Sequence, residues 1–138
     1  MLDVIWPWMH LVARVLFAVS MMVLSAGYFA TSEAPGGHAA SRKKPVPKGA
    51  LLASGIMVWA GAIMIALGWH RFIGSGLVIL FLVPISIKIH NYWSQTDATL
   101  RTVDRLLFWK NIGLVGAALF FATYSRFDWP MSLGKLTP

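Results

Sequence analysis

The sequence predicts an all-α integral membrane protein, a four-helix bundle that forms a single transmembrane domain over residues 1–138. Only 12% of the 138 residues are charged and 57% are hydrophobic, with a mean hydropathy of +0.66. A soluble domain carries about 25% charged residues, so this chain cannot cover itself with polar surface. The apolar residues also fall into four blocks, each close to the ~20 helical residues that cross a bilayer.

The first helix is expected over residues 11–30. Residues 5–8, with the order Ile-Trp-Pro-Trp, are interpreted as an anchor at the membrane interface before the helix begins. Arg14 then falls in the first turn, from which a long side chain can reach the headgroups. His10 precedes the helix, and we expect it to be solvated.

Residues 31–49 form a polar link whose prolines and glycines exclude a helix. The link is basic, and we expect its cations to bind anionic lipid headgroups, with a protein partner as the alternative. These lipid-binding candidates are Arg42, Lys43, Lys44 and Lys48.

The second and third helices are expected over residues 50–67 and 72–90, joined by a tight turn at 68–71. Residues 97–105 show apolar positions at helical spacing between charged ones, which predicts an amphipathic segment along the membrane surface. The fourth helix follows over residues 106–124. Small residues four apart predict close packing between helices, at Ala62 and Ala66, Gly113 and Ala117, and Ala118 and Ala122.

Four crossings place both termini and the turn at 68–71 on one side, the terminal side, and the segments 31–49 and 93–105 on the other, the loop side. Six of the seven tryptophans fall at expected helix ends, as in an aromatic belt. Eight of the twelve basic residues lie on the loop side. This excess predicts that the two loops face the cytoplasm, in a bacterial or archaeal cytoplasmic membrane. Because the cations flank apolar blocks, the net charge of +7 indicates lipid contact, not nucleic acid.

The chain resembles the DoxX family of small four-helix membrane proteins over about residues 11–124. The likeness is carried by an aromatic–Lys–Asn–apolar–Gly pattern, a glycine-spaced helix that ends in Gly–x–x–Arg, a histidine followed by aromatics, and an early arginine. In this chain these are Phe108-Trp109-Lys110-Asn111-Ile112-Gly113, Gly61 with Gly68 and Arg71, His90-Asn91-Tyr92-Trp93, and Arg14. The resemblance implies a redox association, because named members of the family work with thiosulfate:quinone oxidation or with oxidative-stress partners.

Polar residues at the end of the third helix and the start of the fourth are expected at the same depth on the loop side. We expect a polar pocket there that suits a quinone head or a lipid phosphate. The alternative is that these groups bond one another and only hold the helices in register. The candidate cofactor-binding residues are His90, Asn91, Lys110 and Asn111, with Trp93 and Trp109 as walls.

The five acidic residues lie outside the expected helix cores, which predicts a pocket without a carboxylate and favours a protein with no catalytic activity of its own. The chain has no cysteine, and the spacing of its four histidines predicts no metal site. Two functions remain open. One is a redox-linked subunit that anchors an oxidoreductase and places a quinone. The other is an accessory subunit of a respiratory or photosynthetic assembly that holds lipid, carotenoid or pigment. Both imply other membrane subunits as partners.

Overall fold

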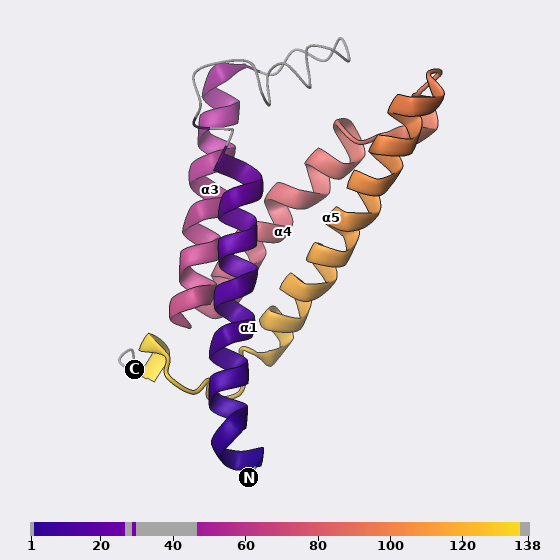
Figure 1. Cartoon of the computed structure of the whole chain (residues 1–138). Coiled ribbons are helices and arrows are strands. Elements are labelled where there is room, and N and C mark those ends of the chain that lie inside the picture. Colours follow the sequence, from indigo (N-terminus) through magenta and orange to yellow (C-terminus); the bar gives the residue numbers. More distant parts are fainter. Residues whose placement is uncertain (1, 27–28, 30–46, 136–138) are drawn as a thin grey trace.

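The computed structural model describes residues 2–26, 29 and 47–135 (Figure 1). It confirms the predicted fold class, an all-α four-helix integral membrane bundle. The four long helices are each long and apolar enough to cross a membrane, and they are α1 Leu2–Ser25, α3 Lys48–Leu67, α4 Arg71–Lys88 and α5 Ala98–Tyr124. Two short 3-10 helices complete the described elements, η2 at Tyr92–Ser94 and η3 at Leu133–Lys135.

The first helix begins at Leu2, well before residue 11, so the segment interpreted as an interfacial anchor is helical. Pro7 lies inside α1, just past its first turn, where it removes the backbone bond to the Asp3 carbonyl and its ring crowds that carbonyl. Most of the basic link, including Arg42, Lys43 and Lys44, lies outside the described residues. Lys48 is the first residue of α3.

The turn between α3 and α4 forms where the sequence predicts it. Gly68 ends α3 in the left-handed conformation with φ 65°. Its N–H donates to the Ile65 carbonyl at 3.1 Å and the Trp69 N–H donates to the Met64 carbonyl at 2.9 Å, which satisfies two of the last four carbonyls of the helix. A residue with a Cβ would be strained at this φ, so glycine is the natural choice here.

Close packing between α3 and α4 depends on a glycine pair. A Cβ added to Gly61 would lie 2.7 Å from the Gly74 carbonyl oxygen, and a Cβ on Gly74 would lie 2.8 Å from Met64 Cβ. The expected small-residue contacts hold in part. Ala62 and Ala118 are fully buried, whereas a Cβ on Gly113 would meet nothing within 4 Å. Gly113 therefore faces outward rather than into the helix–helix contact.

The helices pack in chain order, α1 against α3, α3 against α4, and α4 against α5. Between α1 and α5 the bundle is less closed. Phe17 and Phe121 join them by an edge-to-face contact with ring centroids 5.2 Å apart. From there α1 and α5 diverge toward the loop side, at the top of Figure 1, while both termini lie at the bottom.

The fourth span and the segment before it form one helix. Residues 98–105 are the first two turns of α5 and not a separate surface segment. Asp97 caps this helix, since its side chain accepts the Leu100 N–H at 2.8 Å. At 1.5 Å per residue the 27 residues of α5 extend about 40 Å, more than the ~30 Å hydrocarbon core.

The chain after α5 folds back and closes the terminal side. Trp129 is fully buried there, with Arg14 and Arg71 over its ring at 5.8 Å and 5.2 Å. Arg14 donates to the carbonyls of Pro130 and Met131.

These contacts overturn three expectations. Because α1 starts early, Arg14 sits well inside the helix and is fully buried, so it does not extend to the headgroups. Trp129 is a core residue and not part of the aromatic belt. His10 is not solvated, since its ring packs against Trp129 at 4.9 Å and both ring nitrogens are shielded without a partner among the described residues.

Candidate functional site

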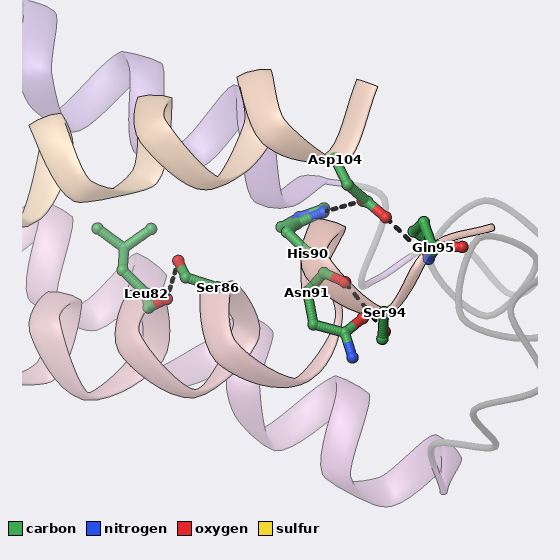
Figure 2. A network of polar contacts seen from close by, with 7 residues as sticks. All are labelled: Leu82, Ser86, His90, Asn91, Ser94, Gln95 and Asp104. Carbon is green, nitrogen blue, oxygen red and sulfur yellow. Dashed lines mark hydrogen bonds and ion pairs between the residues drawn. The ribbon is translucent and has the colours of Figure 1, made fainter. Parts of the chain in front are cut away.

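A buried histidine–carboxylate contact lies at the loop-side end of the bundle (Figure 2). His90 follows the end of α4, and its Nδ1 lies 3.1 Å from Asp104 Oδ1 on α5. The second carboxylate oxygen, Oδ2, accepts a hydrogen bond from Gln95 Nε2 at 3.0 Å. The Asp104 side chain is fully buried and the His90 side chain is 11% exposed. Two residues of the segment between α4 and α5 are thus tied to α5.

This carboxylate corrects the prediction that the loop-side pocket has none. In the sequence Asp104 stands between two arginines, among the charged positions of the amphipathic segment that is expected along the membrane surface. In the structure the buried residues of α5 are Asp104, Asn111, Ala118 and Phe121. Successive members are seven, seven and three residues apart, a spacing that keeps them on one face of a helix. Asp104 and Asn111 therefore lie on the same buried face of α5, two turns apart.

Three of the candidate residues come together around one small cavity. His90, Lys110 and Asn111 line a partly open space of about 60 Å³. Its apolar walls come from α1 and α4, and they are Met21, Leu24, Phe81, Leu82 and Ile85. The cavity therefore lies between α1, α4 and α5.

Asn111 carries the strongest chemical signal in the cavity. Its side chain is only 4% exposed. No hydrogen bond joins its amide to any residue in the described part of the chain, although the sequence suggested one to the neighbouring helix near His90. An amide offers two donors and an acceptor oxygen, and Asn111 borders the cavity, where a ligand or water could pair with these groups. Lys110 is exposed at the same cavity and adds a flexible cation.

The other candidates lie elsewhere. Asn91 does not line the cavity, and its carbonyl accepts the Ser94 hydroxyl at 3.0 Å. Figure 2 shows the Asn91 amide directed away from the His90–Asp104 contact. Trp93 and Trp109 are 51% and 57% exposed, and neither lines the cavity. Both belong to an aromatic cluster around Phe108 on the outer surface of α5.

The chemistry available at the cavity is hydrogen bonding and proton exchange. With Asp104 ionised, Nδ1 of His90 carries the proton and donates to the carboxylate, which fixes the orientation of the ring. The Asn111 amide and the Lys110 ammonium supply further donors. Such a set suits a ligand with carbonyl or hydroxyl oxygens. Among the described residues, no group of three or more His, Cys, Asp or Glu side chains could hold a metal ion.

Fold and site together define a small four-helix integral membrane protein with a polar cavity at one end of its bundle. Comparison with known proteins finds a similar chain in Escherichia coli (strain K12), the inner membrane protein YphA. The two are 25% identical over 116 residues, which cover 84% of this chain and 82% of YphA. No family model matches the chain, and no solved structure matches it.

Proposed function

We propose that the protein is a DoxX-like, redox-linked membrane subunit that anchors an oxidoreductase and holds a quinone head at the cavity of His90, Lys110 and Asn111. The observation that carries the proposal is the Asn111 amide, which is 4% exposed, faces the cavity and lacks a partner among the described residues. A quinone carbonyl would accept its N–H. The His90–Asp104 pair beside it would exchange the proton that accompanies a change in quinone redox state.

The size of the cavity limits how the head is held. Pockets for small molecules usually measure about 300–1,000 Å³, far more than this space of about 60 Å³. Only one carbonyl edge of the ring would enter it. The remainder of the head would extend out through the open side of this cavity, and the isoprenoid tail would extend into lipid. Entry from the bilayer is the natural route for so apolar a molecule.

The similarity to YphA and the charge pattern support a setting for the proposed subunit. We place the protein in a bacterial inner membrane, with residues 31–49 and 93–105 toward the cytoplasm. In that orientation the quinone would bind near the cytoplasmic surface, where a soluble oxidoreductase could dock. The other subunits of such a complex would contact the exposed apolar faces of the helices.

Quinone binding can be measured on the purified protein in mild detergent by titration with decyl-ubiquinone, followed by quenching of tryptophan fluorescence. Asn111→Leu should raise the Kd about 3–10-fold, the equivalent of one hydrogen bond to a neutral acceptor. Trp109→Leu is the matched control, since Trp109 lies outside the cavity, and its Kd should equal that of the wild type. Equal Kd values for wild type and Asn111→Leu would rule out this site.

The alternative function, an accessory subunit that holds carotenoid or pigment and has no chemistry, draws support from the apolar surface. Phe72, Leu106 and Val23 are 69%, 68% and 69% exposed on separate helices. An absorption spectrum of the protein purified from its native membrane separates the two functions. Visible carotenoid or chlorin bands would favour the accessory subunit, whereas a quinone band that changes on borohydride reduction would favour the redox-linked subunit.

A further inference from the structure

A second pocket opens on the loop side, on the outer surface of α5. It measures about 400 Å³ and is lined by Tyr92, Trp93, Arg101, Thr102 and Arg105. It shares no lining residue with the cavity of His90 and Asn111. We infer that this pocket binds the phosphate of an anionic phospholipid. The inference is independent of quinone binding.

Two arginines give the pocket its charge. Arg101 and Arg105 are four residues apart on α5, so they lie on one face of the helix, and both side chains are exposed. Neither has an ion-pair partner in the described part of the chain. Like charges at this spacing repel each other, and a bound anion would relieve that repulsion. Each guanidinium presents a planar set of donors that matches two phosphate oxygens.

The acidic residues nearest in sequence do not neutralise this pair. Asp104 lies between the two arginines in the sequence, but its carboxylate is fully buried and is engaged by His90 and Gln95. Asp97 is engaged at the start of the helix by the Leu100 N–H. The pocket therefore keeps its positive charge, although a carboxylate stands next to it in the sequence.

The aromatic wall gives the pocket a fixed shape. Tyr92 and Trp93 meet edge to face, with ring centroids 5.3 Å apart, and each contacts Phe108 at 5.6 Å. Trp93 remains 51% exposed. Exposed tryptophan at the end of a membrane span typically lies at headgroup depth, because the ring is apolar and its N–H is polar.

The length of α5 also places the two arginines at the depth of the lipid headgroups. The helix exceeds the hydrocarbon thickness by about 10 Å, close to two turns, and Arg101 and Arg105 lie in its first turns. Immediately below them on the helix, Leu106 and Trp109 are 68% and 57% exposed. A lipid whose phosphate bridges the arginines could thus lay its acyl chains along these apolar side chains. A soluble phosphate would not use that surface, so we assign the pocket to a lipid.

The test is native mass spectrometry of the intact protein in neutral detergent, titrated with dioleoyl-phosphatidylglycerol. Dioleoyl-phosphatidylcholine and inorganic phosphate are the comparison ligands. Two arginine–headgroup contacts correspond to about a 30-fold gain in affinity for the anionic lipid, and the double variant Arg101→Gln/Arg105→Gln should lose it. Arg101→Lys/Arg105→Lys keeps the charge but loses the paired donors, and should fall between the two.

The control is Lys88→Gln/Arg126→Gln, which removes the same charge from residues outside the pocket and should bind phosphatidylglycerol as the wild type does. All four proteins should show the same helical circular dichroism, since the substituted side chains are exposed. The inference is overturned by equal affinity for the two lipids, by an equal loss in the control, or by displacement of the lipid by inorganic phosphate at equal concentration.

Discussion

Replacing Asp104 with Asn should destabilise the bundle by about 1–2 kcal/mol. The carboxylate accepts from His90 Nδ1 at 3.1 Å and from Gln95 Nε2 at 3.0 Å, and it is fully buried. An asparagine has one acceptor oxygen, so it can keep one of these bonds and turns its NH₂ group toward the other donor. Losing a hydrogen bond to a charged acceptor costs about 1.5–3 kcal/mol, and the lower cost of burying a neutral amide offsets part of this.

The assay is reversible unfolding in mixed micelles by titration with SDS, which reports the free energy of unfolding directly. Asp97→Asn is the matched control. Asparagine caps helices as well as aspartate, so this exposed change should shift the free energy by less than about 0.5 kcal/mol. Asp104→Leu leaves both donors unpaired and should cost roughly 2–5 kcal/mol. If Asp104→Asn is as stable as the wild type, the buried network does not stabilise this end of the bundle.

Three further outcomes follow from the fold. Gly61→Ala should lower the free energy of unfolding by about 1–3 kcal/mol in the same assay, because its Cβ would lie 2.7 Å from a backbone oxygen of α4. Gly113→Ala is the control, because a Cβ there would meet nothing within 4 Å, and it should be neutral or stabilising. An equal loss of stability in the two variants would contradict the close contact of α3 with α4 at Gly61. Arg14→Met removes the donors that hold the carbonyls of the C-terminal segment, so limited proteolysis should cut that segment faster than in the wild type. An unchanged rate would show that these hydrogen bonds do not hold the segment in place. In this cysteine-free chain, Thr96→Cys should resist an impermeant thiol reagent in intact cells while Asp128→Cys reacts, and the reverse pattern would invert the proposed topology.

The four helices could be predicted because apolar length is a local property of the sequence. The early start of α1 could not, because Trp6 and Pro7 are equally compatible with an interfacial anchor and with a first helical turn. The burial of Arg14 and Trp129 depends on a contact between the two ends of the chain. Hydropathy of a segment carries no information about such a contact, so both were predicted at the membrane surface.

The candidate site was predicted in part. His90, Lys110 and Asn111 do line one cavity, as expected from their depth on neighbouring helices. Asp104 was missed because arginines stand close to it in the sequence, which is typical of a charged surface. Which of these charged side chains is buried depends on how α5 is rotated about its axis, and the local sequence does not show that rotation. A signal was present in the seven-residue spacing from Asp104 to Asn111, which places both on one helical face. The outward direction of Trp109 depends on the same rotation.

The claim that a quinone head occupies the cavity is tested most directly by photolabelling. A photoreactive ubiquinone analogue is bound to the purified protein and illuminated, and the labelled peptides are mapped by mass spectrometry with and without excess decyl-ubiquinone. The account predicts competable label on residues 81–90 of α4 and its exit and on residues 104–111 of α5, the two segments that meet at Asn111. Label confined to the terminal side, or spread over the lipid-facing helices and unaffected by competitor, would contradict it.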